Sequence, residues 1–477
     1  MANLNPLELS IVDIFIQKFD GTDKQSIKSQ FVELLVFQSM FEPTIKAELL
    51  VNDGIGLFFN FPLTGEELVV IQYQQTATLT FGQPNSTTNV KQLQFIIKGV
   101  RNVAVGDRAR SLMYTLDLAS VEFLQNTRKY VAKHYSDNIE NMAKQLYQTY
   151  IQEDTQKLYG KDYINKEFNV EESIKVRSMI VPNLRPFQGI QWLAKHAVAS
   201  ESDKHFLYLF FENNNGFNFV TIQKLIEEAL TKREALKKSS YRYISDNVSD
   251  GIDPNQDLRL ISNIVNNKRL SSIEKIAGGY YQNELFEISM LQKAYNSTPT
   301  ELKSDQTTQD IALEPHPLNT AKYIDYVKNE VVGTEYSNRI RYIINNYEDF
   351  DTENRSQPEY RLKFGNATKY LYALNQIDLT ITIPANIELN AGDIIYCDLP
   401  ETQGFNNVQT DKYLSGLFIV SEVKHVIANG GRAATSLRIY KDGYMTSLFT
   451  SSLYTVAAAQ KSGITLDPST GKIVGGT

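Results

Sequence analysis

Cysteine is almost absent from this chain of 477 residues, since Cys397 is its only cysteine. One cysteine permits neither a disulfide within the chain nor a zinc site built from several cysteines. No apolar run approaches the roughly 18 residues that span a bilayer. Residues 1–6 also lack the basic and apolar parts of a secretion signal. We therefore expect a soluble protein that is not itself a membrane anchor.

The chain also lacks an excess of positive charge, because it has 48 Lys and Arg against 55 Asp and Glu, which gives a net charge of −7. Proteins that bind nucleic acid on their own usually carry a basic excess, so stable nucleic-acid binding is not expected. The 27 Tyr and 24 Phe exclude a disordered chain, which would be poor in aromatic residues. At about 100–200 residues per domain, the length predicts two to four domains.

Motifs that carry chemistry are missing. The sequence has no P-loop, no zinc-protease helix and no Gly-x-Ser-x-Gly elbow. The acidic segment 349–354 lacks the glycine and the distal glutamate of a calcium loop. The histidines have no metal-binding spacing and are interpreted as structural residues: His134, His196, His205, His316 and His425. We predict no catalytic residue, cofactor or metal site, and the chain is not expected to be an enzyme.

Strand-like runs of β-branched residues dominate both ends of the chain, and helical spacing appears between them. This pattern predicts a mixed α+β fold, dominated by β-structure, in which two related β-barrel domains flank and interleave with α+β insertions. We expect five segments: an N-terminal β-barrel at 1–125, an α+β middle domain at 126–254, an insertion with the start of the second barrel at 255–370, a C-terminal β-barrel at 371–456 and a flexible tail at 457–477.

Local patterns give sharper expectations for the centre of the chain. Helical spacing of apolar residues extends from 121 to 158, and Pro186 is expected to precede a helix at 190–198 that holds the only Trp. An Asn-Gly turn between two apolar runs predicts a hairpin at 205–221. The polar, proline-containing segment 297–322 is expected to be a loop.

A repeat links the two β regions. Phe95 to Val103 match Phe418 to Val426 at a fixed offset of 323, with Val or Ile and a basic residue at equivalent positions. A Gly-acidic turn precedes each of these strands, and a further strand follows each. The repeat predicts two domains of one design, in which Phe95 and Phe418 face the core.

The C-terminal region resembles one family. Its features are a Gly-Asp turn at 392–393, a Leu-Ser-Gly strand entry at 414–416, an apolar strand that contains a histidine at 418–426 and a Leu-containing strand that ends in Lys441-Asp442. These elements, in this order, resemble the last barrel of the baseplate hub proteins of contractile phage tails and related injection machines.

The resemblance implies a structural hub in the tail baseplate of a virion, assembled in the bacterial cytoplasm. Members of the family are trimers whose two barrels per subunit form a pseudo-hexameric ring. The ring adapts the sixfold tail tube to the threefold cell-puncturing spike. Implied partners are further copies of the chain, the trimeric spike, tube or tube-initiator proteins and other baseplate wedge proteins, with transient passage of tape-measure protein and DNA. The alternatives are the hub of a non-phage contractile injection system, a cell-wall hydrolase and a receptor-binding tail protein.

Two groups of residues are candidates for subunit or partner interfaces. The first follows a glycine loop and is expected to be an exposed apolar contact: Leu57, Phe58, Phe59 and Phe61. The second is the strand entry of the C-terminal barrel: Tyr413, Ser415 and Gly416.

Overall fold

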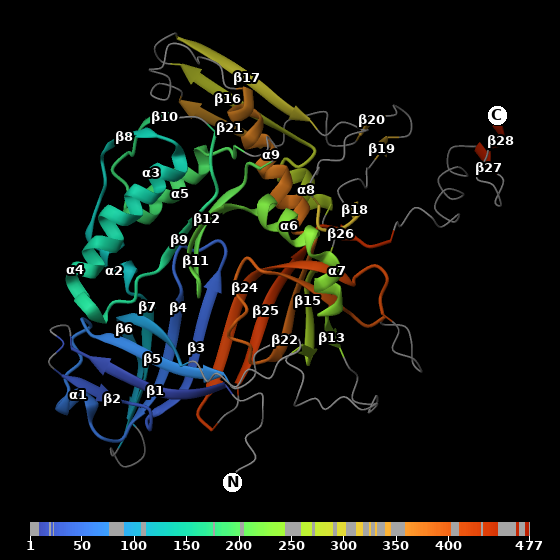
Figure 1. Ribbon diagram of the computed structural model, residues 1–477. Coiled ribbons are helices and arrows are strands. Elements are labelled where there is room, and N and C mark those ends of the chain that lie inside the picture. The colour runs from blue at the N-terminus through green and yellow to red at the C-terminus, as the bar shows by residue number, and fades with distance from the viewer. Residues whose placement is uncertain are drawn as a thin grey trace.

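The structure of the chain is a computed structural model. It describes residues 9–18, 21, 23–75, 90–105, 111–174, 177–200, 205–243, 259–269, 272–289, 293–301, 312–317, 324–325, 330–331, 339–344, 358–401, 410–430, 433–446, 464–466 and 473–476. Figure 1 shows the N-terminal strands and the C-terminal strands side by side, with helices above them.

The N-terminal half is a row of antiparallel strands in the order β2-β1-β5-β6-β7-β4-β3. Alternating residues such as Leu34 and Val36 are fully buried in its core, as expected for strands with one face covered. Its elements are β1 (Leu9–Gln17), β2 (Lys24–Ser26), β3 (Phe31–Ser39), β4 (Lys46–Asp53), α1 (Leu57–Asn60), β5 (Leu68–Gln75), β6 (Lys91–Val105) and β7 (Leu112–Ser120).

The C-terminal half is built from two separate stretches of chain. Its strands are β13 (Tyr241–Tyr243), β14 (Leu260–Ile261), β15 (Asn263–Arg269), β22 (Ile377–Pro384), β23 (Ile394–Asp398), β24 (Gly416–Ala428), β25 (Ala433–Lys441) and β26 (Gly443–Tyr444). Pairing proceeds through β13-β23-β24-β25-β22-β15. It returns to β13 through β14, which directly precedes β15 and pairs with β13 in parallel.

The two halves repeat one topology, as the sequence predicts. In chain order β1, β3, β4, β5, β6 and β7 correspond to β13, β15, β22, β23, β24 and β25, and the order of neighbours in the sheet is the same. The register repeats too, since Leu68 faces Ile96 and Ile394 faces Ile419. Each long strand also has a bulge at the same place, at Lys98 in β6 and at position 421 in β24. One difference is that β13 runs parallel to β23, whereas β1 runs antiparallel to β5.

The halves are joined into a single 14-stranded sheet, because β24 pairs along β3 from Glu422–Ser39 to Ala428–Glu33. Phe95 and Phe418 are at most 1% exposed, so both belong to the core, as predicted. The β-dominated α+β fold class is thus confirmed, and the two related β regions form one continuous sheet.

The middle unit packs helices against one two-stranded and one three-stranded sheet and has its own core, whereas apolar residues of its last two helices, such as Ile226 and Leu236, pack into the C-terminal core. Its elements are α2 (Glu122–Arg128), β8 (His134–Asp137), α3 (Ile139–Tyr147), the π-helix η2 (Gln148–Gln152), α4 (Glu153–Tyr159), the 3-10 helix η3 (Gly160–Asp162), β9 (Glu167–Val170), β10 (Arg177–Ile180), α5 (Pro186–His196), β11 (Tyr208–Asn213), β12 (Gly216–Thr221), α6 (Ile222–Thr231) and α7 (Arg233–Lys238). The predicted hairpin is confirmed as β11 and β12. The helix of the only Trp begins at Pro186 and not at residue 190, since proline is tolerated in the first helical turn.

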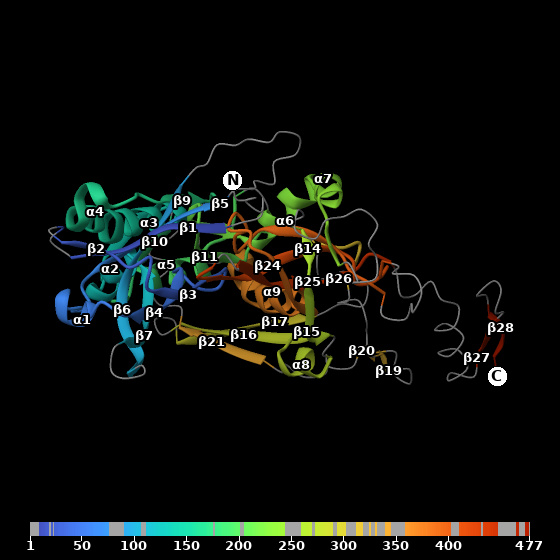
Figure 2. The ribbon, with the colours of Figure 1, turned by 90° about the horizontal axis from the view of Figure 1, so that it is seen from below.

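An insertion separates β15 from β22. Its described elements are α8 (Ser272–Ala277), β16 (Gln282–Ser289), β17 (Ala294–Glu301), β18 (His316–Pro317), β19 (Ile324–Asp325), β20 (Glu330–Val331), β21 (Arg339–Ile344) and α9 (Pro358–Leu374), and β27 (Ile464–Leu466) and β28 (Ile473–Gly476) lie in the C-terminal tail. The predicted loop at 297–322 is wrong at two places, because residues up to Glu301 belong to β17 and His316–Pro317 form β18, which pairs with β26. Strand β17 lies at the edge of its sheet, where Pro299 is tolerated. Figure 2 shows β16, β17 and β21 on the opposite side of the molecule from α6 and α7.

Candidate functional site

The first predicted contact is not exposed where the structure describes it. Leu57 is 1% exposed and Phe61 is 9% exposed, and both pack into the N-terminal core. The expectation of an exposed apolar segment is therefore wrong for these two residues, because the short helix α1 turns them inward. The side chains of Phe58 and Phe59 lie outside the described residues.

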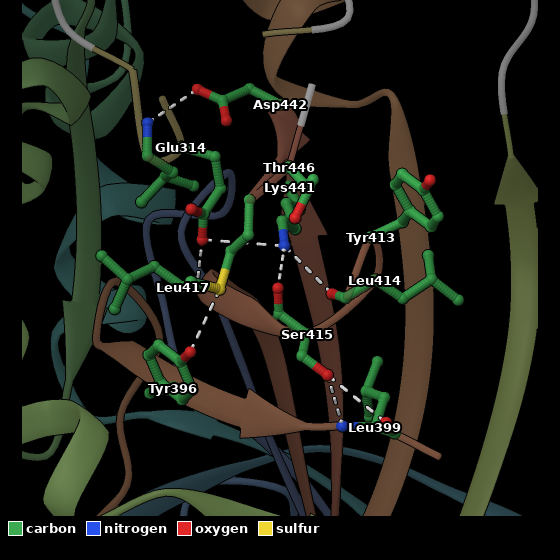
Figure 3. A network of polar contacts seen from close by, with 12 residues as sticks. Glu314, Tyr396, Leu399, Tyr413, Leu414, Ser415, Leu417, Lys441, Asp442 and Thr446 are labelled. Atoms are coloured by element: carbon green, nitrogen blue, oxygen red, sulfur yellow. Dashed lines mark hydrogen bonds and ion pairs between the residues drawn. The ribbon is translucent and has the colours of Figure 1, made fainter. Parts of the chain in front are cut away.

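The second predicted group comes together at one end of the C-terminal half (Figure 3). Ser415 is buried, and its hydroxyl accepts a hydrogen bond of 2.9 Å from the backbone N–H of Leu399. Tyr413 is 41% exposed, and its ring meets that of Tyr444 edge-on at a centroid distance of 5.6 Å. Of the three residues, Ser415 and Gly416 are buried at the strand entry, and the side chain of Tyr413 is exposed to solvent.

The buried ammonium of Lys441 organises this strand entry. Its Nζ donates hydrogen bonds to the carbonyl oxygens of Leu414 at 3.0 Å and Ser415 at 2.6 Å. The side chain is fully buried and its Nζ lies 3.6 Å from Oε1 of Glu314. The charge thus ties the turn before β24 to the end of β25 and to the insertion.

The insertion is fastened to the sheet by the neighbours of Glu314. Oε1 of Glu314 accepts a hydrogen bond of 2.6 Å from the N–H of Leu417, and Oε2 of Glu314 accepts one of 2.6 Å from Arg233. The carboxylate of Asp442 accepts a 2.8 Å hydrogen bond from the N–H of Leu313. Four charged side chains, from α7, the insertion and the end of β25, therefore clamp residues 313–314 to the sheet. We call Arg233, Glu314, Lys441 and Asp442 the strand-entry cluster.

Burial dominates the pKa shifts of Lys441 and Asp442. It lowers the pKa of Lys441 to about 8, although the Glu314 carboxylate opposes the shift. Burial likewise raises the pKa of Asp442 to about 7, while the hydrogen bond from Leu313 acts in the opposite direction. These shifts accompany hydrogen bonds to backbone groups within the chain, which is the arrangement of a structural clamp.

Replacing Lys441 with methionine should lower the free energy of unfolding by about 2–3 kcal/mol, because two buried carbonyl groups lose their donor. Urea unfolding at pH 7 measures this change. The control is Lys412→Met, which removes an exposed lysine beside the same turn. Equal stability of the two variants would contradict the clamp.

A second buried charge cluster joins the N-terminal half to the middle unit. Nζ of Lys166 lies 2.8 Å from Oε2 of Glu122 and 2.5 Å from Oε1 of Glu212, and both carboxylate side chains are fully buried. Burial would lower the pKa of Lys166, but the two carboxylates outweigh it and raise that pKa above its ordinary value. Burial raises the pKa of Glu212, against the effect of Lys166. Glu212 also accepts a 2.9 Å hydrogen bond from the N–H of Ile45. The cluster therefore links the middle unit to the N-terminal half.

The histidines predicted to be structural include three that are buried: His196, His205 and His425. His205 lies between Glu171 and Glu227, with nitrogen–oxygen distances of 3.0 Å to each. His425 pairs across the seam between the halves, and its Nδ1 lies 3.0 Å from Oγ1 of Thr435. Burial lowers the pKa of His425 to about 4 from its usual 6.5.

The buried His425 should make the protein less stable in acid. Its pKa is lower in the folded state than in the unfolded state, so the stability it contributes is full above pH 6.5 and falls as the pH drops toward 4. Lowering the pH from 7.5 to 5 should cost about 2 kcal/mol through this residue. Urea unfolding at both values should show that His425→Gln reduces the difference by this amount. His134→Gln, at an exposed histidine, should leave it unchanged.

Within the described part of the chain, no group of three or more His, Cys, Asp or Glu side chains could hold a metal ion. The helices in that part of the chain are also too short or too polar to cross a membrane. The strand-entry cluster and the Lys166 cluster each hold together segments that are far apart in the sequence.

Reasoning from the sequence missed the acidic and basic partners of the strand entry. The Lys441-Asp442 pair ends a motif in the sequence, but its buried partner Glu314 and the half-buried Arg233 give no local signal. Both lie in polar stretches, and their burial depends on contacts with residues about 80 or more positions away.

No protein-family model matches the chain. The probable baseplate hub protein gp334 of Vibrio phage KVP40 is 20% identical over 435 residues, which cover 89% of this chain and 93% of that protein. This similarity confirms the resemblance to baseplate hub proteins.

Solved structures of tail proteins are also similar to the chain. A tail protein from Neisseria meningitidis MC58 has a TM-score of 0.48 and 9% identity, and the match covers 90% of this chain and 96% of that one. The 43 kDa tail protein of prophage MuSo2 from Shewanella oneidensis has a TM-score of 0.45 and 8% identity, with 90% and 98% covered.

Proposed function

We propose that this protein is a structural hub of a contractile tail baseplate. Three copies would form a ring of six similar β modules, which adapts a sixfold tail tube to a threefold spike around a channel. The role is architectural and requires no catalytic turnover. In a virion the ring would surround the path of tape-measure protein and DNA and contact the other baseplate proteins.

The observation that carries this proposal is the internal duplication. Strand order, register and the position of a bulge repeat between the halves, as in β5-β6-β7 and β23-β24-β25. Two equivalent modules per chain give a threefold assembly six equivalent positions. This property suits a protein that joins a sixfold object to a threefold one. The similarity to a probable baseplate hub protein supports the same role.

Tyr413 remains our candidate for a contact at the strand entry, because its ring is partly exposed above a buried, charge-clamped turn. Ser415 and Gly416 would act indirectly, by holding that turn.

Native mass spectrometry tests the proposal, with the purified chain alone and with candidate spike proteins encoded in the same genome. We expect a trimer, or a 3:3 complex once a trimeric spike is added. A chain that stays monomeric with every spike and with tube protein would contradict the adaptor. Release of cell-wall fragments by the protein would instead favour a hydrolase.

A further inference from the structure

A groove of about 460 Å³ lies where three parts of the molecule meet. Its walls come from α5 and β11 of the middle unit, from α9 and β21 of the insertion, and from the turn between β3 and β4. Apolar side chains line it, including Phe41, which is 40% exposed, and Leu371, which is 38% exposed. Solvent thus reaches large apolar groups inside a formed groove, which is typical of a site that binds another molecule.

The described charged residues of this groove have one sign. Among the described residues that line it are Lys195, Arg341 and Lys363, and none of these described residues is Asp or Glu. The whole chain carries a net charge of −7, so the groove is a locally basic site on an acidic protein. Lys363 is held in the wall by hydrogen bonds to the carbonyl groups of Ala194, at 3.1 Å, and Ala197. Apolar walls with cations complement a segment that is both apolar and acidic.

The described parts of the chain that form the groove occur once, although the strands occur twice. Its walls depend on the middle unit and on the insertion between β15 and β22. In the N-terminal half, the connection equivalent to that insertion is only the turn between Ser39 and Lys46. A ring of three chains would therefore carry six copies of the β module and three copies of the groove.

Symmetry then distinguishes the two kinds of partner. A sixfold partner needs a surface that both halves of the chain provide, whereas a threefold partner can bind surfaces that occur once per chain. We propose that the groove receives an acidic, apolar segment of the trimeric spike. This inference rests on the proposed hub function and adds where, and by what chemistry, the spike is held.

Binding measurements with groove variants test the proposal. The full-length chain is titrated with the trimeric spike candidate from the same genome, and the dissociation constant is measured by biolayer interferometry at fixed salt. Lys195→Glu reverses an exposed charge of the groove, and Leu371→Glu places a carboxylate on its apolar wall. We expect each to weaken binding about tenfold. Lys237→Glu, the same charge change at an exposed position on α7, should change it less than twofold.

Each outcome decides a different question. Weakening by both groove variants but not by the α7 variant, with circular dichroism and oligomer mass unchanged, supports the inference. Unchanged affinity of both groove variants overturns it and leaves the hub function standing. Weakening by Leu371→Glu alone rejects an acidic segment as the occupant. If the unaltered chain binds no spike candidate, the proposed function fails and the inference fails with it.

Discussion

Replacing Lys166 with methionine is expected to lower the free energy of unfolding by about 3–5 kcal/mol, the cost of removing one partner from a buried ion cluster. The ammonium lies within 2.8 Å of two carboxylates, Glu122 and Glu212, whose side chains are fully buried. Without the Lys166 ammonium, the two buried carboxylates of Glu122 and Glu212 would repel each other with no cation between them. Urea unfolding followed by tryptophan fluorescence measures the effect, since Trp192 is the only Trp and packs against the middle unit's core.

Two further variants make this prediction specific. Lys161→Met removes an exposed lysine nearby in the sequence and should change the stability by less than about 0.5 kcal/mol. Adding Glu212→Gln to Lys166→Met removes one of the stranded charges and should restore part of the loss. If Lys166→Met is as stable as the Lys161 control, the cluster does not stabilise the contact between the two units.

Gly416→Ala is expected to cost about 3–5 kcal/mol, from overpacking together with backbone strain. A Cβ atom at this position would lie 2.1 Å from Oε1 of Glu314 and 2.7 Å from Nζ of Lys441, and the backbone φ is +139°. The methyl group would have to displace a buried ion pair. Thermal unfolding should show a large fall in Tm, and limited proteolysis should show earlier cleavage near Tyr413.

Gly99→Ala is the matched control. It lies in β6, the strand equivalent to β24, and an added Cβ would meet no atom within 4 Å. Its effect should stay within about 1 kcal/mol. Adding Glu314→Ala to Gly416→Ala removes the atom that the new methyl group would strike, so the two substitutions should be markedly non-additive. Additive effects would reject the clash.

The duplication was predictable from the sequence because its signals are local. Apolar residues alternate along each strand, and glycine turns precede β5 and β23, where Gly65 and Gly392 have φ values of 88° and 95°. Such positions favour glycine whatever the rest of the chain does. The seam between β3 and β24 gave no such signal, because its partners, such as Val36 and His425, lie almost 400 residues apart.

The candidate contact sites also depended on packing between residues that are distant in the sequence. The segment that begins at Leu57 is apolar, and an apolar segment after a glycine loop is equally compatible with an exposed contact and with a short buried helix. Only the packing of the N-terminal core distinguishes the two. The groove at α5 and α9 was not predictable, because residues as distant as Phe41 and Leu371 form it and each is unremarkable in its own segment.

The place where the insertion enters the sheet has an evolutionary consequence. The chain leaves the sheet at Arg269 and returns at Ile377, and these two residues face each other across the paired strands β15 and β22. The cost in chain entropy of closing such a loop rises only slowly with its length. We therefore expect evolution to accommodate segments of different length between these two residues while the duplicated strands stay unchanged. A new segment would have to replace the contacts that Glu314 makes with Leu417 and Arg233.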